Sequence, residues 1–382
     1  MAETAAAAGR GDAEVRVSSI ELFFDLVFVF TITQLTALLA SAPNGRSLAQ
    51  IVLMLTSIWW MYAAFAWLTN AVPPDRTALR LPLLAGMTAF FAISLTIPTA
   101  FSGDGVVFAS AYLAVIAIHT VLYMQSARWS VAGVWSFARM NVVAGALILA
   151  ATIVGGTLEY VLWGLAVPIF AITPALVPEE AGWIVPSHFV ERHGLVVMVA
   201  LGESVVAVGI GASGLAITGE MLAVAVLGLI LTAELWWVYF GGDDVEAEGA
   251  LRRMTPTRRE FYFTNAAYYW AHLLILLGIV FDAAALERAI GHAFDPLDFA
   301  RALALAGGTA TFLLGHALFR RFLDLPLRPW RALAALLALA TIPLGTEASA
   351  LAQLAALAAI LGACLVLEGE PAPSVAPVST SD

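Results

Sequence analysis

Apolar residues fill most of the chain in long runs, and short polar segments separate these runs. A helix that crosses a bilayer needs about 20 mainly apolar residues. Runs of this length predict twelve membrane-spanning helices, at residues 18–40, 48–70, 79–100, 105–125, 134–153, 158–176, 188–213, 220–241, 261–283, 298–320, 330–345 and 348–367. Only Gly345, Thr346 and Glu347 interrupt the apolar stretch that holds the last two. The pattern therefore predicts an all-α polytopic membrane protein.

Composition removes several classes of function. Of the 382 residues, 61% are hydrophobic and only 12% are charged, which leaves no room for a soluble catalytic domain. All 18 basic residues are arginines, so the chain has no lysine for a Walker A loop or a Schiff base. Cys364 is the only cysteine, which excludes a multi-cysteine zinc site. We predict no cofactor and no metal, and the net charge of -10 argues against nucleic-acid binding.

The distribution of arginines predicts the orientation of the helices. With twelve spans, all but three of the 18 arginines lie on the side of the membrane that holds the N-terminus; the exceptions are Arg46, Arg288 and Arg301. Positive residues accumulate in cytoplasmic segments, so both termini are placed in the cytoplasm. Residues 1–17 and 368–382 are predicted to be flexible cytoplasmic tails, and residues 177–187 a cytoplasmic connection. The run DDVEAEGALRR at 243–253 mixes signs and favours a solvated loop.

The two halves of the chain share a pattern of uncommon residues. The matches come in the same order: Asp25 and Glu203 in the first predicted helix of each half, WWMY and WWVY in the second, and His119 and His316 in the fourth. The pattern predicts two repeats of six helices, at residues 18–176 and 188–367. Because six is even, both repeats enter the membrane from one side, which indicates a parallel repeat about the membrane normal.

Ionisable residues inside the predicted spans are the candidate functional groups, because each costs at least ~2.5 kcal/mol at the bilayer centre. By helical rise, five of them lie in one layer roughly 6 to 12 Å from the cytoplasmic boundary: Asp25, Glu203, Glu234, His119 and His316. Candidates for transport or a proton relay are Glu21, Asp25, Glu203, Glu234, His119 and His316. Glu21 and Asp25 share a helix face, where they repel unless a cation, a proton or an arginine intervenes. Arg139 and Arg192 are candidates for structural ion pairs.

The repeat also predicts contacts between these groups. If the first and fourth helices of each half are neighbours, Asp25 with His119 and Glu203 with His316 form equivalent pairs that exchange protons. The alternative is that each histidine bonds a backbone carbonyl in its own helix and each acid binds an arginine or a hydroxyl such as that of Ser57 or Thr33. His188 and His193 lack the spacing of a zinc site, so we predict no metal there.

Two long motifs resemble a known family. ELFFDLVFVFTITQL (Glu21 to Leu35) and HFVERHGLVVMVALGESVVAVG (His188 to Gly209) resemble signatures of the bacterial low temperature requirement A (LtrA) membrane proteins, as does WLTNAVPPDRTALR at 67–80. The resemblance implies a protein of the bacterial inner membrane that is linked to growth in the cold. The resemblance does not imply a settled biochemical activity, and it assigns no site residues.

Transport is the function that the intramembrane acids favour, as a transporter or channel for a proton, a cation or a small solute. A second class is an enzyme that modifies a lipid or an isoprenoid, although the chain has neither a G-x-S-x-G nor an H-E-x-x-H motif. A third class is a non-transporting scaffold, which the short connections disfavour. The partners expected are the bilayer and an unknown ion or solute, and the sequence leaves open a homo-oligomer.

Overall fold

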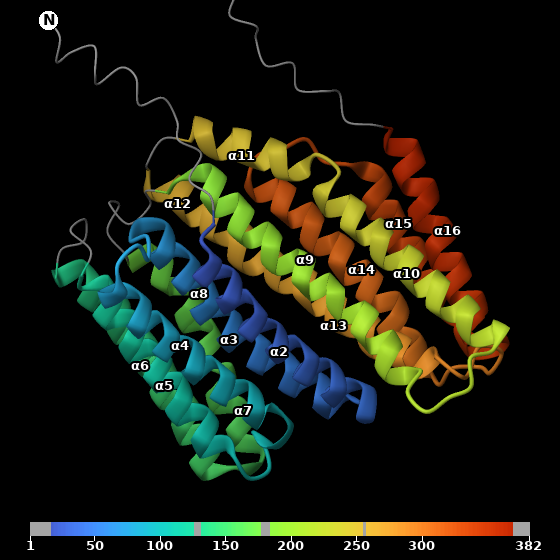
Figure 1. The fold of residues 1–382 in the computed structure, drawn as a ribbon, viewed down its shortest axis with the longest axis horizontal. Helices are drawn as coiled ribbons and strands as arrows, with labels where there is room; N and C mark the ends of the chain where they lie inside the picture. The colour runs from blue at the N-terminus through green and yellow to red at the C-terminus, as the bar shows by residue number, and fades with distance from the viewer. Residues whose placement is uncertain (1–16, 126–130, 177–183, 255–256, 370–382) are drawn as a thin grey trace, which may run out of the picture.

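The computed structural model describes residues 17–125, 131–176, 184–254 and 257–369, and within these ranges the protein is all-helical (Figure 1). Twelve of the described helices are long and apolar enough to cross a membrane. Each overlaps one predicted span, so the all-α fold and the twelve helices are confirmed. The last two spans, Pro329–Ala348 and Ala350–Glu368, are separate helices as predicted.

Within residues 17–125 and 131–176, seven α-helices form six spans. They are α2 (Ser19–Ser41), α3 (Gly45–Ala71), α4 (Thr77–Thr96) with the 3-10 turn η1 (Ile97–Thr99), α5 (Gly105–Tyr123), α6 (Val131–Val154), α7 (Gly156–Gly164) and α8 (Ala166–Leu176). Asn44 is the N-terminal cap of α3. Its side chain accepts hydrogen bonds from the backbone amides of Arg46 and Ser47, which satisfies the first free N–H groups of α3.

The second half adds a short charged helix and two π-helical turns. Its elements are α9 (Pro186–Gly211), α10 (Gly219–Phe240), α11 (Asp243–Arg253), α12 (Arg258–Asn265), the π-helix η3 (Ala266–Ala271), α13 (His272–Ala289), α14 (Phe299–Phe322), α15 (Pro329–Ala340), the π-helix η4 (Leu344–Ala348) and α16 (Ala350–Glu368). Pro186 and Pro329 open α9 and α15, where the missing N–H of proline costs no hydrogen bond. Asp298 caps α14 by accepting from the amide of Arg301.

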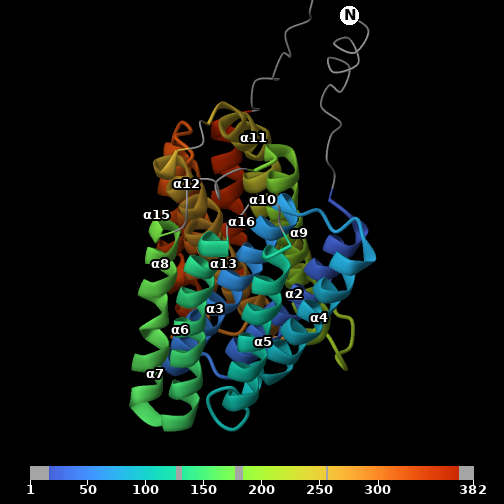
Figure 2. The same cartoon turned by 90° about the vertical axis from the view of Figure 1, so that its left-hand side faces the viewer.

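The charged run at 243–253 is not the solvated loop that its sequence favours. It forms α11, whose residues Ala247, Ala250 and Leu251 are buried in a small apolar core with Phe189 of α9 and Phe319 of α14. The spacing of these three residues puts them on one face of a helix. Figure 2 shows α11 lying at the end of the bundle opposite α7.

The helices of the two halves have the same neighbours along the chain. In the first half α2 packs on α4, α4 on α5 and α5 on α6; in the second half α9 packs on α13, α13 on α14 and α14 on α15. The boundary between the halves is formed by α2 and α3 against α9 and α13. The correspondence between the halves ends at this boundary. The first span of the first half, α2, packs on α13, the third span of the second half. The equivalent contact, of α9 with α4, is not close among the described helices.

This boundary contains the most buried helices of the protein. The share of buried residues is 89% for the most apolar window of α3 and 83% for that of the span formed by α12, η3 and α13. Glycines allow α13 and α14 to approach closely: a Cβ at Gly278 would come within 2.7 Å of the Gly308 carbonyl, and one at Gly315 within 2.7 Å of the Ala271 carbonyl. Such small residues permit backbone contact between membrane helices.

Candidate functional site

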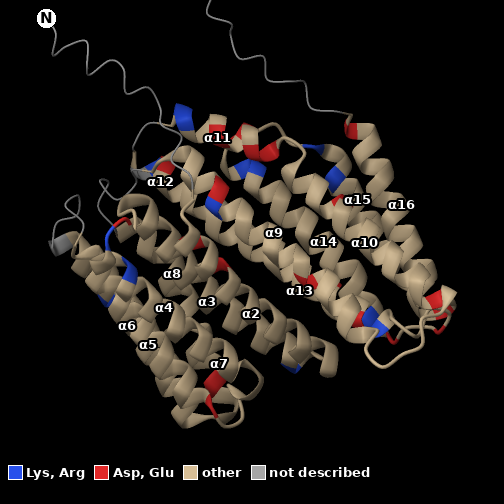
Figure 3. Cartoon of the chain, in the orientation of Figure 1, with Lys and Arg blue, Asp and Glu red and all other residues tan. Residues whose placement is uncertain are grey.

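Two groups of buried charged residues lie where helices meet near one end of the bundle, whereas most of the helical surface carries no charge (Figure 3). We call the first the interface cluster, because it joins the two halves of the chain. It consists of Glu21, Asp25, Tyr62, His188 and Arg192. We call the second the clamp cluster, and it consists of Asp243, Glu246, His316, Arg320, Arg328, Arg331 and Glu368.

Arg192 of α9 is the cation of the interface cluster. Its Nη2 lies 3.1 Å from Oδ1 of Asp25, and its Nε lies 3.9 Å from Oε1 of Glu21. The guanidinium also lies over the rings of Phe24 and Tyr62, 5.7 Å from each centroid. Glu21, Asp25 and Arg192 are each only 1% exposed, so water does not screen these charges.

Hydrogen bonds fix the two carboxylates from both sides of the boundary. The Tyr62 hydroxyl of α3 donates to Oδ1 of Asp25 at 2.5 Å. The amide and hydroxyl of Ser18 donate to Oε2 of Glu21 at 2.9 and 2.7 Å. Nε2 of His188 lies 3.3 Å from the same carboxylate. The first turns of α2 and α9 and the end of α3 therefore meet at one point.

The tautomer of His188 follows from its second neighbour, Asn70. The Asn70 amide is oriented by Val185, whose N–H donates to Oδ1 at 2.8 Å and whose carbonyl accepts from Nδ2 at 3.1 Å. Nδ2 also lies 3.1 Å from Nδ1 of His188. Since Nδ2 is a donor, Nδ1 accepts and Nε2 carries the proton that points to Glu21.

The interface cluster is neither balanced in charge nor fully paired. Two carboxylates face one guanidinium, so the group is neutral only if His188 gains a proton or if a proton or a cation joins the carboxylates. Four of its buried polar atoms have no hydrogen-bond partner: Oε1 of Glu21, Oδ2 of Asp25, and Nε and Nη1 of Arg192. Buried polar groups without a hydrogen bond are costly, so these four atoms distinguish the interface cluster from an ordinary structural ion pair.

Glu203 of α9 lies on the same boundary, where it faces Thr33 of α2. Its Oε2 accepts a hydrogen bond of 2.6 Å from the Thr33 hydroxyl, and its Oε1 is buried without a partner. Thr33 follows Asp25 by eight residues, or about 12 Å of helix. Beyond it, a cavity of about 400 Å³ lies between the halves, lined by Leu39 and Leu48 from one half and Phe281 and Leu303 from the other.

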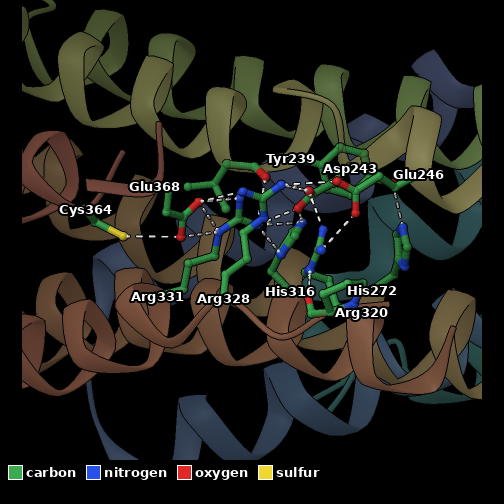
Figure 4. A network of polar contacts seen from close by, with 12 residues as sticks. Tyr239, Asp243, Glu246, His272, His316, Arg320, Arg328, Arg331, Cys364 and Glu368 are labelled. Atoms are coloured by element: carbon green, nitrogen blue, oxygen red, sulfur yellow. Dashed lines mark hydrogen bonds and ion pairs between the residues drawn. The ribbon is translucent and has the colours of Figure 1, made fainter. Parts of the chain in front are cut away.

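The clamp cluster differs because it lies within the second half (Figure 4). Asp243, at the start of α11, receives Nη1 of Arg320 and Nη1 of Arg331 at 2.5 Å each, and Nε2 of His316 lies 3.0 Å away. Arg331 also forms a bidentate pair with Glu368 at 2.9 to 3.1 Å. This network ties α11, α14, α15 and α16 together.

Pairing in the clamp cluster is nearly complete. Glu246 accepts from Nη2 of Arg320 at 2.8 Å and from Nη2 of Arg328 at 3.2 Å, and Nε of Arg320 donates to the Pro326 carbonyl at 2.7 Å. Three carboxylates therefore meet three guanidiniums. The arrangement is that of a structural ion-pair network.

The structure separates the residues that the sequence grouped as candidates. Glu21, Asp25 and Arg192 come together, and Glu203 lies along the same boundary. His316 belongs to the clamp cluster. Arg139 is exposed on α6. Glu234 lies half-buried on α10 against Gly362 of α16, away from the other acids.

The expected pairs of an acid with a histidine do not form. No ion pair joins Asp25 to His119, or Glu203 to His316, among the described residues. His119 instead lies with its Nε2 3.1 Å from the Ala64 carbonyl, to which it donates. The alternative is right for the acids, because Asp25 binds Arg192 and Glu203 binds the Thr33 hydroxyl. It is wrong for the histidines, because the Ala64 carbonyl lies on α3 rather than on the helix of His119, and His316 lies 3.0 Å from Asp243.

Sequence reasoning missed most of the clamp cluster. The segment after α10 begins with acidic residues, including Asp243 and Glu246, and residues 320–331 carry Arg320, Arg328 and Arg331. This complementarity of charge was the signal available. Asp282 of α13 was also missed; it is buried, and the Thr309 hydroxyl lies 3.3 Å from its carboxylate. No group of three or more His, Cys, Asp or Glu side chains suited to a metal occurs in the described ranges.

Comparison with known proteins gives a relative and a family. The chain is 28% identical over 326 residues to an uncharacterized protein of Rhizobium meliloti, a match that covers 81% of this chain and 78% of the relative. No solved structure matches. The family model of the bacterial low temperature requirement A protein matches residues 16–366, nearly the whole chain. The protein is therefore a multi-pass membrane protein that belongs to the bacterial LtrA family.

Proposed function

We propose that the protein is a proton- or cation-linked transporter or channel whose ion passes along the boundary between the two halves. The observation that carries this proposal is the unbalanced interface cluster, in which two buried carboxylates share one guanidinium. The missing positive charge is supplied by the transported proton or cation. Glu203 of α9, which faces Thr33 of α2, is the next binding group along the boundary, and it has an oxygen without a hydrogen-bond partner.

Arg192 is the element that responds to the ion. It lies 3.1 Å from Asp25 and 3.9 Å from Glu21, so a shift of about 1 Å exchanges its partner. A proton or cation on Asp25 removes the attraction to Arg192 and favours the contact with Glu21. Because Glu21 and Asp25 lie on α2 and Arg192 on α9, this exchange favours a different packing of the two halves.

The proposal includes two six-helix repeats, at residues 18–176 and 188–367, related by an axis along the membrane normal. The shared order of neighbouring helices in the two halves supports this arrangement. The unequal contact of α2 with α13 means that the two repeats do not play identical parts. We place both termini in the cytoplasm of the cell and the protein in the inner membrane, on the distribution of arginines.

The test uses the full-length protein in vesicles on a solid-supported membrane. A jump in the concentration of H⁺, Na⁺ or K⁺ is expected to produce a transport current for one of these ions. Asp25→Asn and Glu203→Gln should abolish it, because each removes a charge on the boundary. Glu234→Gln is the matched control, since it removes an acid that lies away from the boundary.

Two results would contradict the proposal. The first is the absence of any current with the three ions in vesicles whose protein is folded, as shown by size-exclusion chromatography after extraction. The second is an undiminished current in both Asp25→Asn and Glu203→Gln.

A further inference from the structure

The end of the bundle that carries α11 has two adjoining cavities outside the interface cluster. One, of about 720 Å³, lies between α11 and the loop before α15, and its lining includes Val245, Leu325 and Leu327. The other, of about 260 Å³, lies between α11, α12 and the end of α14. Arg253 lines both of them, so they form one continuous surface.

The smaller cavity is lined by more guanidiniums than carboxylates. It is lined by Arg253, Arg259 and Arg321, with Glu260 and Asp324 as its acids. In the described structure neither Arg253 nor Arg321 forms an ion pair, and Arg259 lies over the ring of Phe263 at 5.2 Å. The three guanidiniums outnumber the two carboxylates, so the cavity attracts an anion.

Arg253 and Arg321 each follow an arginine that is already paired with a carboxylate. Arg253 and Arg321 lie in the last turns of α11 and α14, where cations are favoured. Each of these turns already contains a second arginine that is engaged: Arg252 pairs with Glu248 at 2.6 Å, and Arg320 pairs with Asp243. Each of these helix ends therefore carries one guanidinium that a carboxylate binds and a second that forms no ion pair within the described structure.

The larger cavity adds an apolar surface beside the cationic one. Val245 is 56% exposed and Leu327 is 60% exposed at its rim. An apolar groove next to a group of arginines matches a molecule with an anionic head and a hydrocarbon tail. This end of the bundle is also the one that the arginine distribution predicts to be cytoplasmic, where anionic lipids are available.

We propose that Arg253 and Arg321 bind the phosphate group of an anionic phospholipid, with an acyl chain along Val245 and Leu327. Arg259 adds charge to the same cavity. The site does not depend on the proposed transport, because its residues lie outside the interface cluster and its ligand is a component of the bilayer.

Native mass spectrometry of the full-length protein in detergent tests the site with phosphatidylglycerol as the probe. Arg253→Gln should weaken binding about fivefold, and the double variant with Arg321→Gln roughly 25-fold. Arg252→Gln is the matched control: it removes a neighbouring arginine that already has a carboxylate partner, and it should leave binding unchanged. Arg253→Lys keeps the charge and should retain most of the binding.

Further measurements distinguish a lipid headgroup from a free phosphate. Phosphatidylcholine should bind more weakly than phosphatidylglycerol, and millimolar inorganic phosphate should not displace the bound lipid. Equal binding of the two lipids would overturn the proposal. Equal losses of lipid binding in Arg253→Gln and Arg252→Gln would also overturn it. The same holds if inorganic phosphate displaces the bound lipid and Arg253→Gln weakens this effect of phosphate.

Discussion

The interface cluster and the clamp cluster use the same residue types for different purposes. Both are buried, and both join acidic side chains to arginines and a histidine. The clamp cluster balances three carboxylates with three guanidiniums and holds helices of one half together. The interface cluster has two carboxylates for one guanidinium and joins the two halves. The two clusters therefore differ in charge balance and in the helices that they join, although both are built from buried acids and arginines.

The largest effect should come from breaking the clamp cluster. Arg331→Gln leaves Asp243 with one fewer guanidinium and removes the bidentate partner of Glu368. Removal of one partner of a buried pair costs about 3 to 5 kcal/mol, so we expect a corresponding loss in the free energy of unfolding. Reversible unfolding in denaturing detergent measures it. A loss no greater than that of Arg252→Gln would show that the clamp cluster is not structural.

A smaller effect should follow removal of the Tyr62 hydroxyl. Tyr62→Phe deletes the hydrogen bond of 2.5 Å to Asp25, and hydrogen bonds to charged groups contribute about 1.5 to 3 kcal/mol. Tyr112→Phe is the control, because this buried tyrosine donates to the Ser57 carbonyl, an uncharged acceptor, and its loss should cost about 0.5 to 1.5 kcal/mol. Equal losses in the two variants would mean that Asp25 is not charged when it accepts this bond.

Asp25→Asn should separate stability from transport. The substitution leaves Arg192 with Glu21, one cation with one anion, so the cluster becomes balanced. We expect a change of about 1 kcal/mol or less in the free energy of unfolding, together with loss of the ion-driven current. A loss of stability as large as that in Arg331→Gln would make the interface cluster a second structural clamp.

The smallest effect should be that of Glu234→Gln. Glu234 lies half-buried between α10 and α16, and the substitution keeps the shape of the side chain. The current should stay within about twofold of wild type, because this acid lies away from the boundary. A current reduced as strongly as in Asp25→Asn would place the pathway between α10 and α16 instead.

The sequence predicts the helices well and their contacts poorly. Each span is a local property, since about 20 apolar residues suffice to mark it. The partner of Asp25 is a tertiary property: Arg192 is far along the chain, whereas Arg139, the other candidate, is exposed on α6. The same holds for His119, whose acceptor is a carbonyl on α3.

The clamp cluster was missed for a related reason. The mixed charges at 243–253 resemble those of a solvated segment, and only the packing of Ala247 and Leu251 brings Asp243 inside. The arginines that neutralise Asp243 are about 77 residues away or more. Periodicity within a segment carries no information about such distant partners.

The π-helical turn at Ala266–Ala271 sets the register of the most central span of the second half. A π-turn contains one more residue than an α-turn, so α13 is rotated by about 100° relative to an uninterrupted continuation of α12. This rotation points Asp282 toward Thr309 and places Gly278 against Gly308. A chain one residue shorter at this turn would form a straight α-helix and turn those groups away from α14. A loop can lose one residue without changing the contacts of its neighbours. A deletion in this π-turn is instead expected to disrupt the packing of α13 on α14.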